Sequence, residues 1–263
     1  MESITVRRFI GVLVACGISM AAYAQGAYWE SQVSGGPLGD KVMNQKMFYM
    51  PKMAKTIDDE SGQVVIIRLD KEMIYTLDPS KKEYSQKTFE EMEKSMKKVN
   101  SKMAEMQKKL EKMPPEQRKM MEQMLGDKMM GKNQDAPATV TSGNEKRTIS
   151  GYSCAKHVVN QSGKEIMTVW ATKEIKEFEA MRKDWEQFTR RLMAMSPGGA
   201  QSIADAFQKI QGFPIEVDME QGMKTVVTKF ERHTTPAAEF EVPPGYTKVD
   251  KGLMDSAQED REE

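Results

Sequence analysis

Residues 62–86 read GQVVIIRLDKEMIYTLDPSKKEYSQ, and this stretch decides the fold. It holds three short runs rich in β-branched and aromatic residues, with breaks at Asp70 and at residues 78–80. Runs of this composition favour strands, and the breaks favour tight turns. Parallel strands need a crossover connection of a dozen or more residues. The close spacing therefore predicts an antiparallel meander.

The same pattern continues along the chain on both sides of this stretch. Strands are predicted over 27–33, 41–50, 147–160, 164–172, 213–220 and 223–233, and the segment 240–249 is predicted to dock the end of the chain. Helical periodicity interrupts them over 88–131, about 173–195 and roughly 200–211, with a break at residues 196–199. Residues 132–147 are interpreted as a polar connector. This order predicts an α+β protein whose curved antiparallel sheet carries helices on one face.

The helical stretch 88–131 is predicted to be a hairpin inserted into the β domain. Apolar residues recur three and four positions apart through 89–113, which places them on one stripe of a helix. Thr88 and Glu91 form a capping box at its start, and the two prolines at 114–115 end it. The second helix presents Met120, Met121, Met124 and Leu125.

Methionine dominates that stripe, although leucine would specify a core better. Three interpretations are open: core packing, an adaptable apolar lid that re-packs around varied ligands, and a Cu(I) site made of thioethers. For the Cu(I) site the candidate ligands are Met120, Met121 and Met124. The candidates for the lid or the wall of a cavity are Met92, Met96, Met103, Met106, Met120, Met124, Trp170 and Trp185.

The N-terminus has the organisation of a secretory signal peptide. Arg7 and Arg8 form a basic region, residues 9–22 are mostly apolar and uncharged, and residues 22–24 read Ala-Tyr-Ala, a small-x-small cleavage pattern. We therefore expect residues 1–24 to be removed on export and the mature chain to lie in the periplasm.

A second interpretation of this segment is a lipobox. Residues 13–17 read LVACG, and acylation of Cys16 would tether the domain to a membrane surface without changing its fold. Under either interpretation we expect a single domain over residues 25–249. The acidic, polar residues 250–263 are predicted to be a disordered tail.

Composition and motifs exclude several classes of function. The chain has 39 basic and 39 acidic residues, whereas a nucleic-acid footprint needs a basic excess or stripe. It contains no G-x-S-x-G, no H-E-x-x-H and no phosphate-binding glycine loop. We therefore expect a protein that is not an enzyme, binds no cofactor and does not bind nucleic acid.

Cys154 and His157 form a C-x-x-H pair. Positions three apart on a strand point to opposite faces, so the two side chains cannot share a metal ion unless the strand bulges. Cys154 is interpreted as a small buried residue.

Several segments resemble an uncharacterised periplasmic family that is related in fold to the lipoprotein carriers of the LolA/LolB type. They are VIIRLDKEMIYTLDPSKKEYSQ (65–86), TISGYSCAKHVV (148–159), VWAT (169–172), GFPIEV (212–217) and FEVPPGY (240–246). The resemblance implies a half-open β-barrel with helices in its mouth, around an apolar cavity that accepts acyl chains in the carriers. The Met-rich insertion departs from the carrier pattern, so the identity of the cargo does not transfer.

These inferences lead to one expected function and two alternatives. We expect a non-enzymatic cell-envelope protein that binds an apolar, acyl-chain or lipoprotein-like ligand between the sheet and the Met-rich helices. The alternatives are a Met-rich periplasmic protein that binds Cu(I), and a structural module that docks a protein partner through the 88–131 hairpin.

Overall fold

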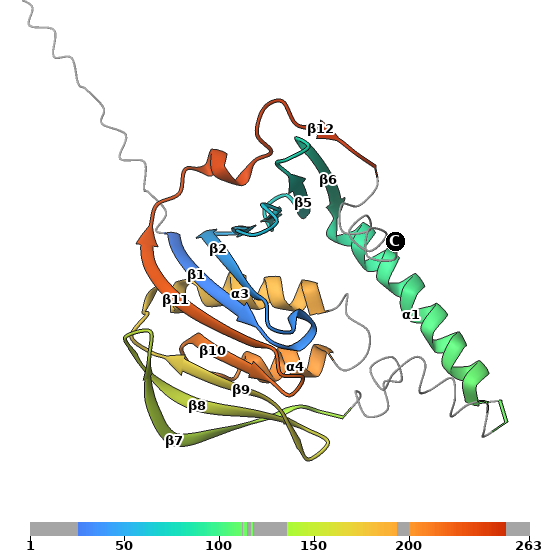
Figure 1. Ribbon diagram of the computed structural model, residues 1–263, viewed down its shortest axis with the longest axis vertical. Helices are drawn as coiled ribbons and strands as arrows, with labels where there is room; N and C mark the ends of the chain where they lie inside the picture. Colours follow the sequence, from blue (N-terminus) through green and yellow to red (C-terminus); the bar gives the residue numbers. More distant parts are fainter. Residues whose placement is uncertain (1–25, 112, 115–116, 118–135, 194–199, 251–263) are drawn as a thin grey trace, which may run out of the picture.

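The computed structural model describes residues 26–250, except 112, 115–116, 118–135 and 194–199. Its main element is one sheet of 12 strands, in the order β12-β6-β5-β4-β3-β2-β1-β11-β10-β9-β8-β7 (Figure 1). The strands are β1 (Gly26–Ser34), β2 (Val42–Met50), β3 (Met53–Asp58), β4 (Val64–Arg68), β5 (Met73–Asp78), β6 (Glu83–Thr88), β7 (Thr139–Ile149), β8 (Tyr152–Gln161), β9 (Lys164–Thr172), β10 (Phe213–Met219), β11 (Lys224–His233) and β12 (Thr247–Lys248).

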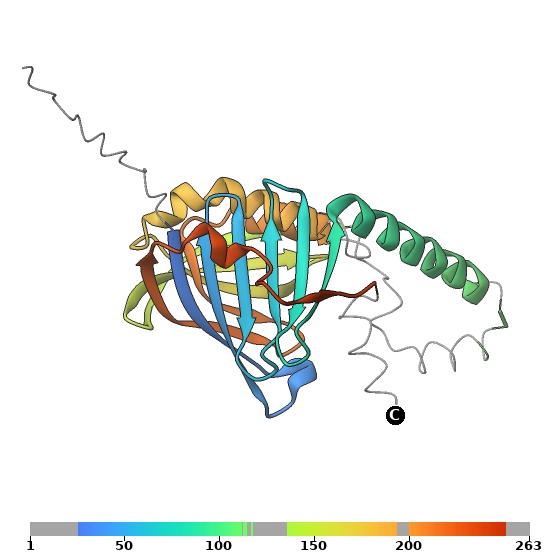
Figure 2. The same cartoon turned by 90° about the horizontal axis from the view of Figure 1, so that it is seen from above.

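The sheet consists of two antiparallel meanders, β1–β6 and β7–β11, joined side by side. The junction is the antiparallel pairing of β1 with β11, which runs from Gly26 opposite His233 to Ser34 opposite Lys224. The short β12 pairs with β6 in parallel. Figure 2 shows how the strands curve together. The antiparallel meander predicted from residues 62–86 is confirmed, and so is the curved sheet predicted from the order of the elements.

The turns form where the sequence provides turn residues. The Asp58 carboxylate accepts hydrogen bonds from the backbone N–H groups of Glu60 and Ser61, and Asp78 accepts one from Ser80 in the same way. These Asx turns close the β3–β4 and β5–β6 hairpins.

Two parts of the chain differ from the prediction. The interval 132–147 was interpreted as a connector, but β7 already begins at Thr139 and pairs with β8. The predicted single strand 147–160 turns sharply at Ser150 and Gly151, whose φ angles are 49° and 85°. Two successive positive φ angles suit a tight hairpin turn, so this serine-glycine pair separates β7 from β8.

Two helices, α3 (Glu177–Met193) and α4 (Ala200–Phe207), cover one face of the sheet (Figure 1). They enclose a core in which aromatic rings from both layers meet. Its fully or nearly buried members include Trp29, Phe178, Met181, Phe188, Phe213 and Ile215. The prediction of helices on one face holds for this pair.

The helix α1 (Phe89–Glu111) is the first arm of the predicted hairpin, and it extends away from the sheet beyond β6 (Figures 1 and 2). Its capping box forms as expected: the Thr88 hydroxyl accepts from the Glu91 N–H at 3.0 Å, and the Glu91 carboxylate accepts from the Thr88 N–H at 2.8 Å. The predicted second arm lies outside the described residues, as do the predicted signal peptide and most of the predicted acidic tail.

The opposite, outer face of the first meander is covered by the C-terminal segment, residues 236–249. This segment contains a 3-10 helix (Ala237–Phe240) that lies against β3 and β4, and it ends in β12 (Figure 2). Phe240 is fully buried there. It packs in a second apolar cluster with Met50, Val64, Ile66 and Leu77. The predicted docking of residues 240–249 is confirmed.

A buried arginine fastens this segment to the sheet. Arg68 is 6% exposed, and its guanidinium pairs with the carboxylates of Asp70 and Glu241 and donates to the Phe240 carbonyl at 3.2 Å. Lys71 pairs with Glu241 as well. Hydrogen bonds from Lys71 and Arg68 lower the pKa of Glu241, and hydrogen bonds from Arg68 lower the pKa of Asp70.

We expect Arg68→Met to lower the free energy of unfolding near neutral pH by about 2 kcal/mol, because it removes charge-assisted hydrogen bonds. Both carboxyl pKa values are lower in the folded state than in the unfolded chain, so their stabilisation is present above the ordinary values of 4.5 and 3.8 and is lost as the pH falls. The difference between variant and wild type should therefore shrink in acid. Urea unfolding at several pH values measures it.

The control is Lys81→Met, which removes an exposed partner of Asp78 and should change stability by no more than about 0.5 kcal/mol. A difference for Arg68→Met that stays constant down to acid pH would contradict this account of the ion pairs.

Candidate functional site

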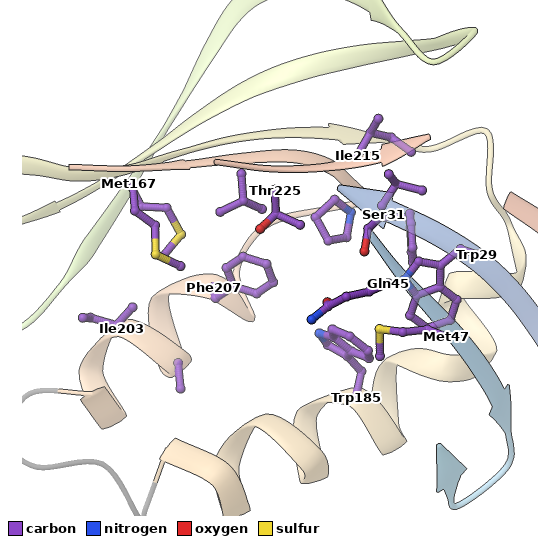
Figure 3. Close-up of a pocket in the computed structure, with 16 residues that line it drawn as sticks. Trp29, Ser31, Gln45, Met47, Met167, Trp185, Ile203, Phe207, Ile215 and Thr225 are labelled. Carbon is purple, nitrogen blue, oxygen red and sulfur yellow. The ribbon is translucent and has the colours of Figure 1, made fainter. Parts of the chain in front are cut away.

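A cavity of about 290 Å³ lies between α3 and α4 on one side and strands β1, β2, β9, β10 and β11 on the other (Figure 3). Its wall is mostly apolar. The lining residues are Trp29, Ser31, Gln45, Met47, Met167, Trp185, Ile203, Ala204, Phe207, Phe213, Pro214, Ile215, Val217, Met219, Thr225 and Val227.

Strand alternation explains which sheet residues reach the cavity. Trp29 lies opposite Met47, and Ser31 lies opposite both Gln45 on β2 and Val227 on β11. Side chains of directly opposite residues share a face, and every second residue of a strand returns to it. The β1–β2–β11 part of the wall therefore follows from register.

Two β-bulges lie in the wall. The β1–β11 register shifts between Glu30 and Ser31, and the β10–β9 register shifts between Pro214 and Glu216. A bulge bends its strand and increases the local twist. Both bulges adjoin lining residues, so we attribute to them the local curvature that holds this part of the sheet away from the helices.

Both helices that cover the cavity are held by polar contacts with the sheet layer. Asp184 of α3 accepts hydrogen bonds from the Tyr49 hydroxyl at 2.8 Å and from the Lys52 N–H at 2.5 Å. At the start of α4, the Ser202 hydroxyl accepts from the Gln161 side-chain amide at 3.2 Å. These contacts fix Trp185 and Phe207 over the cavity.

A group of aromatic rings lines one part of the cavity wall. The Trp29 ring lies 6.1 Å from that of Trp185 and 5.6 Å from that of Phe213, centroid to centroid. Phe213 also meets Phe178 and Phe230, at 5.5 and 5.1 Å. All four contacts are tilted or edge-to-face, the arrangements that the aromatic quadrupole favours.

The polar side chains in the wall are neutral. Ser31, Gln45 and Thr225 point into the cavity in Figure 3, and no charged side chain is among the described lining residues. The site can therefore hold an uncharged, largely apolar molecule without burying an unpaired charge.

Residues 90–246 match the family described as Domain of unknown function (DUF4412). This match spans more than half of the chain. The chain belongs to the DUF4412 family. The matched region begins in α1 and includes β7–β11, α3 and α4, and it ends in the C-terminal segment. A comparison with curated proteins finds no match.

Solved structures show distant likeness to this DUF4412 chain. An uncharacterized conserved protein from Thermus thermophilus is 9% identical, with 86% of this chain and 90% of that chain covered and a TM-score of 0.44. PNGF-II is 10% identical over 89% of this chain and 32% of its own, with a TM-score of 0.38. MucB in complex with MucA(peri) is 6% identical over 88% and 59%, with a TM-score of 0.39. At these TM-scores the likenesses carry no argument about fold or function.

Among the sequence-predicted site residues whose side chains the structure describes, one lies at the cavity. Trp185 lines it from α3. Trp170 lies on the other face of β9 from the lining residue Met167, since positions three apart alternate. There the Arg147 guanidinium covers the indole ring, 4.1 Å from its centroid.

The predicted helical methionines do not line the cavity where they are described. Met92, near the start of α1, packs partly buried against the main core, and Met106 is 48% exposed. Met96 and Met103 lie farther along the backbone of α1. Met120, Met121 and Met124 lie outside the described residues, so both their predicted ligand contacts and the Cu(I) interpretation stay predictions.

Contacts at its first turns hold α1 to the body of the protein. Phe89 is buried in the main core, and the Arg191 guanidinium of α3 lies 5.5 Å from its ring centroid. Arg191 also pairs with Glu93 of α1 at 3.3 Å and with Glu72 at 3.2 Å. The base of α1 is therefore fixed next to the C-terminal end of α3.

Sequence reasoning missed the methionines that do line the cavity. Met47, Met167 and Met219 come from strands β2, β9 and β10. Each faces the helices by strand alternation, and Met167 lies opposite Met219. Strand alternation is the signal in the sequence that could have identified these methionines. The denser methionine stripe of the predicted helix drew the prediction to the helix instead.

Cys154 and His157 have separate environments. Cys154 is fully buried, and burial raises the pKa of its thiol to about 11. The His157 Nδ1 lies 2.8 Å from the Ser142 hydroxyl, and burial lowers the pKa of the imidazole. Among the described residues, no group of three or more His, Cys, Asp or Glu side chains could hold a metal ion.

None of the described helices combines the length and the apolar character that a membrane span requires.

Proposed function

We propose that this protein is a non-enzymatic binding protein of the cell envelope that holds an apolar or acyl-chain ligand in the cavity beneath α3 and α4. The observation that carries the proposal is the wall itself: aromatic, aliphatic and thioether side chains from five strands and two helices surround about 290 Å³ of space. Concave, mostly apolar sites with a few polar groups are the usual form of small-ligand sites.

The chemistry of the described wall supports binding rather than catalysis. The Ser31 hydroxyl is the candidate nucleophile in the wall. However, no histidine, lysine, cysteine or carboxylate that could activate it is among the described lining residues. Nucleophilic and general acid–base catalysis both require such a partner.

The size of the cavity sets the scale of the ligand. An apolar cavity of ~150 Å³ accepts benzene, so this one suits on the order of ten carbon atoms. Burying a chain of that size contributes roughly 25 cal/mol per Å² before the costs of ordering it. The cavity opens to solvent, which allows a longer chain to extend beyond it.

The resemblance to a periplasmic family that is related in fold to the LolA/LolB carriers supports the same proposal. A curved antiparallel sheet with helices over one face agrees with the half-open barrel that the resemblance implies. An apolar cavity between sheet and helices agrees with it as well. Export through residues 1–24 would place the protein in the periplasm, where such ligands occur.

The test is a fluorescence titration with N-phenyl-1-naphthylamine, a neutral probe that brightens in apolar cavities, combined with native mass spectrometry of the purified protein. We expect saturable binding of the probe at one site per chain, and displacement of the probe by lipids with medium-length acyl chains. A folded protein that neither binds the probe nor carries a co-purified lipid would refute the proposal.

A further inference from the structure

Three polar side chains of the cavity lie on neighbouring strands. Gln45 on β2 is directly opposite Ser31 on β1. Ser31 is opposite Val227 on β11, and Thr225 is two residues before Val227, so Thr225 is the diagonal neighbour of Ser31. Cross-strand neighbours lie about 5 Å apart at Cβ and diagonal ones about 7–8 Å. The three polar groups therefore form one short row across β2, β1 and β11.

This row has no protein partner within the described part of the chain. No side-chain hydrogen bond of Ser31, Gln45 or Thr225 to another described residue is present, while the neighbouring Gln32 donates to Asn44 on the other face. Figure 3 shows the oxygen atoms of Ser31 and Thr225 and the amide of Gln45 directed into the cavity. A ligand that fills the cavity excludes water from these groups, so a ligand that carries a polar group able to pair with them is favoured.

The lysines next to this row in sequence do not share its face. Lys46 follows Gln45, and alternation turns it to the outer face, where it pairs with Asp59 at 2.9 Å. Lys224 precedes Thr225 and pairs on that outer face with Glu216 at 3.1 Å. The cations nearest in sequence are thus committed to acidic partners on the far side of the sheet.

The hydrogen-bonding inventory of the row matches a neutral group. The amide of Gln45 offers two N–H donors and a carbonyl acceptor, and each hydroxyl can donate and accept. An ester, amide or alcohol satisfies such a set. A carboxylate would bring a full negative charge among apolar side chains without a cation to pair with it.

We propose that the cavity selects acyl chains whose polar end is uncharged, such as an acyl ester, acyl amide or long-chain alcohol, and that Ser31, Gln45 and Thr225 bind that end. A free fatty acid is disfavoured in its ionised form. This inference rests on the proposed function and specifies its ligand class.

Displacement of N-phenyl-1-naphthylamine by ligands that share one alkyl chain tests the inference. The competitors are 1-monolauroylglycerol, laurate and dodecane, compared at about pH 8, where the laurate carboxylate is ionised. We expect the glyceride to bind at least about tenfold more tightly than laurate, a difference of about 1.4 kcal/mol.

The variant Gln45→Leu keeps the shape of the side chain and removes its hydrogen bonds. We expect its affinity for the glyceride to fall about tenfold, while its affinity for dodecane stays equal or increases. The matched control is Gln32→Leu, the same substitution on the exposed outer face of β1, which should leave all three affinities unchanged.

Two outcomes would overturn the neutral-group inference while the proposed function stands. One is laurate binding as tightly as the glyceride. The other is Gln45→Leu weakening the glyceride and dodecane equally, which would reduce Gln45 to a packing role. If neither the probe nor any competitor binds the folded protein, the proposed function fails, and this inference fails with it.

Discussion

Ile203→Trp is expected to weaken binding of N-phenyl-1-naphthylamine by at least about tenfold, because the indole would occupy the space that the ligand needs. Ile203 is half-buried on α4 and projects into the cavity opposite the sheet (Figure 3). The partly open cavity can accept the larger ring without displacing the aromatic rings of the wall. Probe titration measures binding, and guanidinium unfolding shows whether the variant remains folded.

The matched control is Val42→Trp. Val42 begins β2, is 48% exposed and does not line the cavity, so the same kind of enlargement there should leave probe binding unchanged. Undiminished binding by a folded Ile203→Trp protein would place the ligand outside this cavity and would remove the basis of the proposed function.

The largest loss of stability is expected for Phe213→Ala. Phe213 is 2% exposed and its ring contacts those of Trp29, Phe178 and Phe230, which join β10, β1, α3 and β11. Removing a buried phenylalanine ring costs about 3–5 kcal/mol of unfolding free energy, from lost burial and from the cavity left behind. Urea or guanidinium unfolding, followed by tryptophan fluorescence, measures this loss.

Met106→Ala is the comparison, because Met106 is an exposed apolar side chain on α1. It should alter stability by no more than about 0.5 kcal/mol. If the two substitutions cost the same, the projecting helix would be as important to the fold as the aromatic part of the cavity wall, contrary to the packing described above.

Local features of the fold could be predicted from sequence because local rules govern them. The closely spaced strands at 62–86 permit only antiparallel connections, and Asp78 forms the turn predicted at residues 78–80. The capping box at Thr88 likewise depends on residues three apart. Each of these predictions involves residues that are close together in the chain.

The features that were predicted wrongly or not at all depend on residues that lie far apart in the sequence. Nothing near β1 identifies β11 as its partner, and the bulges beside Ser31 and Pro214 appear only in the paired sheet. The methionine stripe of α1 predicts an apolar face but not what that face meets. Among its described side chains, Phe89 and Met92 in the first turn pack against the main core. Leu110 in the last turn is also buried, at 4% exposed.

The sequence predicted the type of site, an apolar cavity, but not most of the residues that line it. An apolar space between a curved sheet and helices follows from the strand and helix patterns, and Trp185 was among the residues named for it. The polar row of Ser31, Gln45 and Thr225 was not foreseen, because single polar residues on strands carry no distinctive pattern until register places them together.

The junction between the two meanders has a consequence for the order in which the chain folds. Ribosomes make β1 first among the strands and β11 almost last, so one edge of β1 stays without its partner until nearly the whole chain exists. Contacts that span such long loops form slowly and leave strand edges open to wrong pairings. The first strand of this protein therefore obtains its second hydrogen-bonding partner only when the last strands have been made. We expect C-terminal truncation to promote aggregation rather than to yield a smaller folded domain.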